Sequence, residues 1–343
     1  MKGKLELKIF VQMVVGATII ALTSYYTFDG LQAKPILTVY TYNSFFAHGG
    51  MGSKIKLAFE ETCGCELRLI GFNGGVDLLN RLRIERENSP ADLVLGLDYN
   101  LIDLAKKTGL FDKSYIDISQ LKLPIKWNDD VFVPYDYGYL AFIYDKRHIT
   151  QPPKSFDEFI NSTEPWKIIY QDPRTSTLGL GLLLWIQKIY GDKSAAIWKK
   201  IATKTAIITK GWSEAYGLFL KGESDFVLSY SSSPAFHIFN DGQDNYGAVL
   251  FNEGHYLQVE VVAQLRSGRN PQLAQKFMQF IISPFSQKFL STTNWMYPVI
   301  DVSMPEVYRK IKKPTKSLQL KEKDIIKYRN QWIYSWQNAI SYP

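Results

Sequence analysis

Residues 65–98 read CELRLIGFNGGVDLLNRLRIERENSPADLVLGLD, and this stretch predicts the architecture of the chain. Residues 65–72 are typical of a strand, which Asn73-Gly74-Gly75 ends. Residues 76–86 then place leucines at the spacing of an amphipathic helix, and residues 91–97 return to a short apolar run. A strand, a helix and a strand with short connections indicate parallel strands joined by a right-handed crossover.

The same alternation begins before this stretch. Residues 36–40 form an uncharged strand pattern, and residues 53–62 form a helix pattern. Because ligands of open parallel sheets bind at the carboxyl ends of the strands, Tyr42 and Gly74 are placed where a ligand would lie. The sequence therefore predicts an α/β fold with a binding site in these loops.

Two later stretches depart from the simple pattern. Residues 131–144, VFVPYDYGYLAFIY, are interpreted either as a hinge crossing between two lobes or as a decorated edge strand. Residues 170–185, YQDPRTSTLGLGLLLW, place Ser176 and Thr177 at the start of an apolar helix. Hydroxyls and free backbone N–H groups at a helix start suit an anion such as a phosphate, although an ordinary capped and buried helix has the same pattern.

The N-terminal residues predict export. Three lysines in the first eight residues precede an apolar run over residues 9–22, and Ala33 follows a short, more polar segment. This is the pattern of a secretory signal peptide over residues 1–33, with retention as an uncleaved anchor as the alternative. In an exported protein, Cys63 and Cys65 are expected to close a local disulfide rather than bind a metal.

Composition excludes several classes of protein. The 343 residues are 46% hydrophobic and 21% charged, so a buried globular core is expected. The net charge of +7 is spread along the chain without a basic patch interleaved with stacking aromatics, which argues against nucleic-acid binding. The common hydrolase, zinc-protease and nucleotide-binding motifs do not occur, and the four histidines are scattered.

Aromatic rings recur in loops beside hydroxyls or glycines. Tyr42, Trp212 and Trp295 lie at predicted element ends, and Tyr230 is followed by Ser231, Ser232 and Ser233. Rings placed in this way can stack on a flat heteroaromatic ligand or face a cation. Their recurrence in an exported chain favours the binding of a small molecule.

Eight runs of the chain resemble the periplasmic thiamine-binding proteins of bacterial thiamine ABC transporters: LTVYTY, GGVDLLNRLR, ADLVLGLD, VPYDYGY, YQDPRTST, TKGWSEAYGLFLKGESD, EGHYLQVE and NWMYPV. The resemblance implies a type II periplasmic binding-protein fold with two α/β lobes, each a mostly parallel sheet flanked by helices, joined by hinge strands. It implies one lobe over residues 34–134 and 262–343 and another over residues 135–261, with the ligand between them.

The same resemblance implies a function. A monomeric receptor would capture thiamine, thiamine monophosphate or thiamine diphosphate in the periplasm and deliver it to an inner-membrane permease with its ATPase, with no cofactor or metal of its own. The ligand-binding positions it implies are Tyr42, Gly74, Gly75, Ser176, Thr177, Trp212, Tyr230, Ser231, Ser232, Ser233, Phe236 and Trp295. Ser176 and Thr177 would contact the phosphate, and Asp98 and Asp172 are candidates for the partner of the cationic thiazolium.

Two positions depart from the family pattern, and two alternatives remain. Gly74 replaces an acidic residue, and Phe236 replaces a tyrosine and so loses a hydroxyl worth about 0.5–1.5 kcal/mol in a hydrogen bond. The first alternative is a thiaminase-like enzyme on the same fold, which needs a nucleophilic cysteine beside a base. The second is a binder of another small cationic solute, such as a ferric ion or a polyamine.

Overall fold

The computed structural model describes residue 3, residues 33–46 and residues 50–341. The predicted signal peptide therefore lies almost entirely outside the described residues. Within the described ranges, no helix combines the length and the apolar character that crossing a membrane requires.

A single path of paired strands runs through the molecule in the order β2-β1-β3-β9-β4-β7-β5-β6. At one end, β1 (Ile36–Tyr42) pairs in parallel with both β2 (Glu66–Phe72) and β3 (Leu93–Asp98). At the other end, β5 (Ile168–Gln171) pairs in parallel with β6 (Thr205–Thr209) and β7 (Phe226–Tyr230). The predicted strand–helix–strand unit of residues 65–98 is confirmed as β2, α4 (Gly75–Glu85) and β3.

Two long strands join these parallel groups. The strands β4 (Val133–Asp145) and β9 (His255–Gln264) pair with each other in antiparallel fashion. On the side away from β4, strand β9 pairs with β3. On the side away from β9, strand β4 pairs with β7, and it also pairs with the short strands β8 (Tyr246–Ala248) and β10 (Tyr297–Pro298). The edge-strand interpretation of residues 131–144 is therefore wrong, because β4 has partners on both sides.

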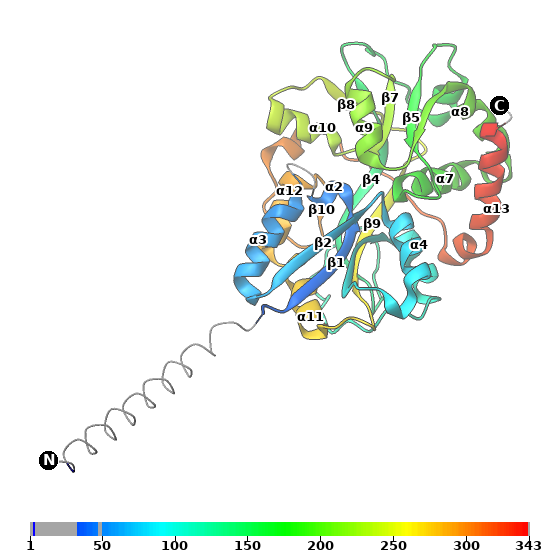
Figure 1. Ribbon diagram of the computed structural model, residues 1–343. Helices are drawn as coiled ribbons and strands as arrows, with labels where there is room; N and C mark the ends of the chain where they lie inside the picture. The colour runs from blue at the N-terminus through cyan, green and yellow to red at the C-terminus, as the bar shows by residue number, and fades with distance from the viewer. Residues whose placement is uncertain (1–2, 4–32, 47–49, 342–343) are drawn as a thin grey trace.

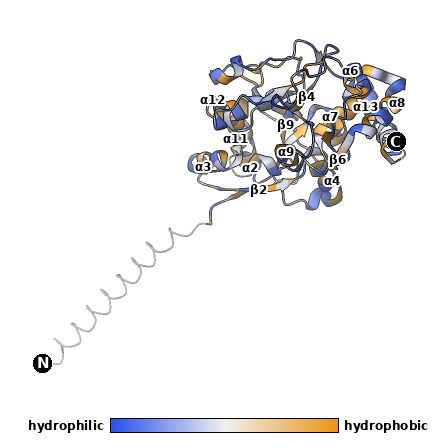
Figure 2. Cartoon of the chain, turned by 90° about the horizontal axis from the view of Figure 1, so that it is seen from above, coloured by the Kyte–Doolittle hydropathy of each residue, from blue (hydrophilic) through white to orange (hydrophobic). Residues whose placement is uncertain are grey.

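Helices cover each parallel group and form two lobes (Figure 1). The first lobe is β1–β3 with α3 (Met51–Cys63), α4, α11 (Pro271–Ile281) and α12 (Pro284–Thr293). The second lobe is β5–β7 with α6 (Phe156–Asn161), α7 (Thr177–Tyr190), α8 (Ser194–Lys204) and α9 (Trp212–Leu220). Viewed from above, β9 has α3, α11 and α12 on one side and α4, α7 and α8 on the other (Figure 2). The predicted two-lobed α/β fold is confirmed.

The short elements complete the outline. They are α2 (Asn43–Phe46), α5 (Ile102–Lys106), α10 (Ser233–Phe236) and β11 (Ser317–Leu318), with helical turns at Arg86–Asn88, Tyr99–Leu101, Gly191–Lys193, His237–Asp241 and Glu306–Arg309. The C-terminal helix α13 (Glu322–Ser341) packs against α8 and α7, and the indole N–H of Trp336 donates to the Tyr170 hydroxyl at 3.1 Å.

The two cysteines of the chain form a disulfide, Cys63–Cys65, as the sequence suggested. Cys63 ends α3 and Cys65 directly precedes β2, with Gly64 between them in a left-handed conformation (φ 63°). The disulfide therefore fixes one helix-to-strand connection of the first lobe.

Candidate functional site

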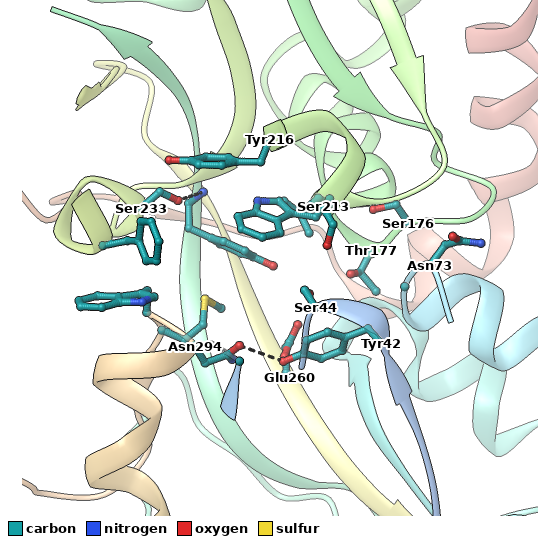
Figure 3. A pocket seen from close by; sticks show the side chains of 18 of the residues that line it. Tyr42, Ser44, Asn73, Ser176, Thr177, Ser213, Tyr216, Ser233, Glu260 and Asn294 are labelled. Carbon is teal, nitrogen blue, oxygen red and sulfur yellow. Dashed lines mark hydrogen bonds between the residues drawn. The ribbon is translucent and has the colours of Figure 1, made fainter. Parts of the chain in front are cut away.

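A cavity of about 290 Å³ lies between the lobes and draws its walls from both of them. Nine of the predicted ligand-binding residues line it: Tyr42, Gly74, Ser176, Thr177, Trp212, Tyr230, Ser233, Phe236 and Trp295. These residues are separated by up to 253 positions in the sequence, from 42 to 295, and the fold brings them together. Figure 3 shows Ser176, Thr177 and Asn73 on one side of the pocket and Ser233 on the opposite side.

The remaining three predicted residues lie next to the cavity without lining it. Gly75 is packed so closely that an added Cβ would be 2.3 Å from the Gly96 carbonyl oxygen and 2.8 Å from Thr177 Cγ2. Ser231 and Ser232 are buried, and neither hydroxyl oxygen has a hydrogen-bond partner within the described residues.

The polar end of the cavity is built by the start of α7. Ser176 is the N-cap, and its Oγ accepts from the backbone N–H of Gly179 at 3.5 Å. The helix can begin this close to the end of β5 because residue 179 is a glycine, whose added Cβ would lie 2.2 Å from the Gln171 carbonyl oxygen. The first N–H groups of a helix have no intrahelical acceptor, so this end offers donors to an anion.

Aromatic rings form the opposite walls. The Trp212 ring stacks on Tyr216 with centroids 4.9 Å apart, and its indole N–H donates to Ser229 Oγ at 2.7 Å. Trp295 has a left-handed backbone (φ 57°), rare for a non-glycine residue, and its ring meets Phe236 edge-on at 5.9 Å. These contacts hold the rings in fixed orientations, which suits stacking on a flat ligand.

A carboxyl group that sequence reasoning missed lies at the floor of the cavity. Glu260, in the middle of β9, lines the pocket and accepts from the Tyr135 hydroxyl at 2.5 Å. Beside it, the Tyr42 hydroxyl donates to Asn294 Oδ1 at 3.3 Å (Figure 3). Burial raises the pKa of the Tyr42 hydroxyl well above its ordinary value, so it is a hydrogen-bonding group rather than an anion.

The two acids that the sequence suggested as charge partners are not at the cavity. Asp98 is fully buried at the end of β3, where it accepts from Asn100, and burial raises its pKa to about 7. Asp172 is engaged by the Arg174 side chain, with Oδ2 2.6 Å from the guanidinium. Neither lines the pocket, so the expectation for both was wrong.

Other lining residues also escaped prediction, among them Ser44, Asn73, Ser213, Tyr216, Asn294 and Met296. Most of them are neighbours of predicted residues in loops, and a rule that included adjacent polar positions would have found Asn73, Ser213 and Asn294. A carboxylate inside the otherwise apolar run VEVVA, residues 259–263, was the available signal for Glu260.

The lobes touch at the polar end of the cavity. The backbone N–H of Asp77 in α4 donates to the Thr175 carbonyl at 3.1 Å, and Asn80 Nδ2 donates to the Arg174 carbonyl at 3.4 Å. A Cβ added to Gly74 would lie 3.1 Å from Ser176 Cα. The starts of α4 and α7, from different lobes, therefore meet over the cavity.

The groups that line the cavity can hold a ligand by stacking, hydrogen bonding and charge. Both cysteines of the chain are in the disulfide, and neither lines the cavity. Within residues 33–46 and 50–341, no group of three His, Cys, Asp or Glu side chains is arranged to hold a metal ion. The cavity offers aromatic faces, hydroxyls, helix N–H groups and one buried carboxyl group.

The chain is similar in sequence to known proteins. Residues 54–314 match the family model described as bacterial extracellular solute-binding protein. The chain is 56% identical to the thiamine-binding periplasmic protein of Escherichia coli K12 over 309 residues, which cover 90% of this chain and 94% of that protein. It is 40% identical to the protein of the same name from Haemophilus influenzae, covering 94% and 98% of the two chains.

Solved structures agree with these sequence relatives. A periplasmic thiamin binding protein has a TM-score of 0.89 and 55% identity, covering 91% of this chain and 98% of that one. A ferric binding protein from Campylobacter jejuni has a TM-score of 0.72 at 20% identity, covering 88% and 99%. At that identity the second likeness shows a shared fold alone.

Proposed function

Since the chain belongs to the bacterial extracellular solute-binding proteins, and among them to the thiamine-binding periplasmic proteins, we propose that its cavity captures thiamine and its phosphate esters in the periplasm. The loaded protein then delivers the ligand to an inner-membrane ABC permease with its ATPase. The observation that carries the proposal is the cavity, because rings, helix N–H groups and a carboxyl group converge there from both lobes.

Each part of thiamine has a matching part of the site. The aminopyrimidine is flat and polar, so it suits the rings of Tyr42, Trp212 and Tyr230. The cationic thiazolium suits aromatic faces and the nearby Glu260 carboxyl group. A phosphate ester suits the start of α7 at Ser176 and Thr177, where a buried anion meets backbone N–H groups and a hydroxyl.

The remaining predicted residues are proposed to shape the cavity. Gly74 and Gly75 allow the start of α4 to approach α7, and the loop of Ser231, Ser232 and Ser233 supports Tyr230 at the end of β7. Phe236 keeps an aromatic surface beside Trp295 at 5.9 Å.

The lobes are proposed to close about β4 and β9, which are the strands they share. The division into residues 34–134 with 262–343 and residues 135–261 serves as the starting proposal. We propose one amendment, that residues 322–341 belong to the second lobe, and the contacts of α13 with α7 and α8 support it. Export by residues 1–33 and a monomeric state belong to the same proposal.

The relatives are binding proteins, and this protein is proposed to bind thiamine without cleaving it. A thiaminase-like activity would need a thiol at the cavity, but Cys63 and Cys65 are joined in the first lobe away from it. Incubation of thiamine with the purified protein, followed by chromatography, should therefore recover the vitamin intact.

Isothermal titration calorimetry tests the proposal. We expect saturable binding of thiamine, its monophosphate and its diphosphate with micromolar or lower Kd, and no displacement of thiamine by ferric ion or a polyamine. Trp212→Ala should weaken all three ligands, whereas Tyr334→Ala, which removes an exposed ring on α13, should not. Absence of a thiamine signal would reject the proposal, and displacement by iron or polyamine would favour another solute.

A further inference from the structure

Two buried carboxyl groups belong to neighbouring strands beneath the cavity, and one of them, Glu260, lines it. Asp136 of β4 and Glu260 of β9 are direct cross-strand partners, and a register shift between Pro134 and Asp136 sets this pairing. Asp136 is fully buried and Glu260 is 5% exposed. Side chains of directly opposed residues in antiparallel strands lie on the same face, about 4.5–5.5 Å apart at Cβ.

The hydrogen bonds of the pair are incomplete. Glu260 accepts from the Tyr135 hydroxyl at 2.5 Å and from Gln258 Nε2 at 3.0 Å. Asp136 Oδ2 accepts from Asn294 Nδ2 at 2.7 Å, whereas its Oδ1 has no partner among the described residues. Gln258 Oε1 is a second buried acceptor without a donor in the same part of the chain. The floor therefore has more acceptors than donors.

The groups around the pair supply no positive charge. Tyr42 of β1 and Tyr230 of β7 face Glu260 as neutral hydroxyls, and Asp98 of β3 is a third acid nearby. Arg329 of α13 acts on Asp98, and within the described residues no Lys, Arg or His forms an ion pair with Asp136 or Glu260.

Two carboxylates without a cation in a buried site cannot both be ionised at neutral pH. Burial raises the pKa of Glu260, and burial together with the Glu260 charge raises the pKa of Asp136. One member of the pair therefore keeps a proton while the cavity is empty. A cation entering beside Glu260 would replace that proton as the compensating charge.

We propose that Asp136 and Glu260 share one proton in the empty protein, act as the counter-charge for a cationic ligand, and release that proton to solvent when the ligand binds. This inference rests on the proposed function, because the thiazolium of thiamine supplies the cation. It adds a selection rule: the site favours a cation over a neutral molecule of the same shape, and affinity rises with pH.

The direction of the pH effect follows from proton release. If binding expels up to one proton, affinity for thiamine rises by at most about tenfold per pH unit over the range in which the pair holds its proton. The neutral aminopyrimidine fragment, 4-amino-5-hydroxymethyl-2-methylpyrimidine, lacks the thiazolium. It should bind without releasing a proton, and it controls for titration of the pyrimidine ring itself.

Calorimetry in two buffers of different ionisation enthalpy measures the release directly. The wild-type protein at about pH 7 should release a measurable fraction of a proton with thiamine and none with the fragment. Combining Glu260→Gln with Asp136→Asn should bring the release close to zero, because the two changes together remove both buried acids that can hold the proton. Each single change should also weaken thiamine by about tenfold or more.

Asp98→Asn is the matched control. It removes the neighbouring acid, whose pKa burial raises to about 7 and on which the Glu260 charge also acts, so the release that comes from the Asp136–Glu260 pair should remain in this variant. Infrared difference spectra give a second measurement, in which thiamine should abolish a protonated carboxyl band in the wild type and in Asp98→Asn. The infrared measurement uses only the wild type and Asp98→Asn, so it does not depend on whether variants of Glu260 or Asp136 fold.

The outcomes separate the two proposals. Thiamine binding with no proton release and no loss of the carboxyl band would overturn the shared-proton pair and leave the proposed function intact. Release that persists in the double variant, Glu260→Gln with Asp136→Asn, would also overturn it. Failure of thiamine to bind at all would overturn both proposals together.

Discussion

Gly74→Ala should weaken thiamine binding without destabilising the folded protein. Gly74 precedes α4 with an extended backbone (φ 173°, ψ 179°), which alanine adopts without strain. The added Cβ would lie 3.1 Å from Ser176 Cα, 3.2 Å from the Thr175 carbonyl oxygen and 3.4 Å from the Thr177 nitrogen. All three atoms belong to the backbone of the other lobe, so the contact exists only where the lobes meet.

The size of the effect follows from the cost of overpacking. Forcing an extra carbon into a close backbone contact costs about 1–3 kcal/mol, which corresponds to a loss of roughly 5- to 150-fold in affinity. When the lobes separate the contact disappears, so the free energy of unfolding should change by less than about 0.5 kcal/mol. Thiamine and its phosphates should lose affinity together, because closure is common to all of them.

Two other glycines provide the controls. In Gly75→Ala the Cβ would lie 2.3 Å from the Gly96 carbonyl oxygen of the same lobe, so this change should lower the free energy of unfolding itself. In Gly217→Ala, within α9, the Cβ meets nothing within 4 Å, and affinity should be unchanged. Calorimetry gives the affinities and urea denaturation the stabilities. Wild-type affinity in Gly74→Ala would refute the reasoning that close approach at this residue is required for binding.

Three further predictions concern the anion end and the buried acids and bases. Thr177→Pro keeps a residue that suits the first position of α7 but removes its N–H and its hydroxyl. Calorimetry should show that thiamine phosphates bind about 10- to 100-fold more weakly and that thiamine loses much less affinity. Equal losses would mean that the start of α7 has a structural role and does not bind the phosphate. The pKa of Asp98 is raised by burial to about 7, so as pH rises the unfolded chain loses this proton before the folded protein does. The free energy of unfolding should therefore fall by up to about 4 kcal/mol as pH rises from about 4 to 7. In urea denaturation Asp98→Asn should flatten this dependence on pH, and an unchanged slope would contradict the assignment. The pKa of His255 is lowered by burial to about 4, so as pH drops the unfolded chain takes up a proton before the folded protein does. The free energy of unfolding should therefore fall by up to about 3 kcal/mol as pH drops from about 6.5 to 4. His255→Gln should remove this part of the acid sensitivity, and a retained slope would exclude His255 as its source.

Local patterns predicted the parts of the molecule that depend on local structure. The helix-spaced leucines between two apolar runs specified β2, α4 and β3, because those periods match a buried helix face and a buried strand. The site residues came from the family resemblance rather than from local patterns alone, and nine of them line the cavity, where loops at element ends converge in this kind of sheet. The hydroxyls of Ser176 and Thr177 marked the start of α7 within one residue.

Local sequence patterns did not predict which distant strands and helices lie side by side. Glu260 reaches the cavity because β9 lies between β3 and β4, a neighbourhood that no local pattern encodes. Asp98 looked available at a strand end, yet the surrounding packing buries it. The packing of α13 on α7 and α8 joins residues at least 118 positions apart (204 to 322), and an amphipathic pattern does not specify which helices it packs against.

A crystal structure of the protein with thiamine monophosphate is the most direct test of the account. We predict that the phosphate lies within hydrogen-bond distance of the Thr177 N–H and the Ser176 hydroxyl, with the rings of the vitamin between Trp212 and Tyr42. A phosphate directed toward Trp295, or a ligand bound outside the cavity, would contradict it.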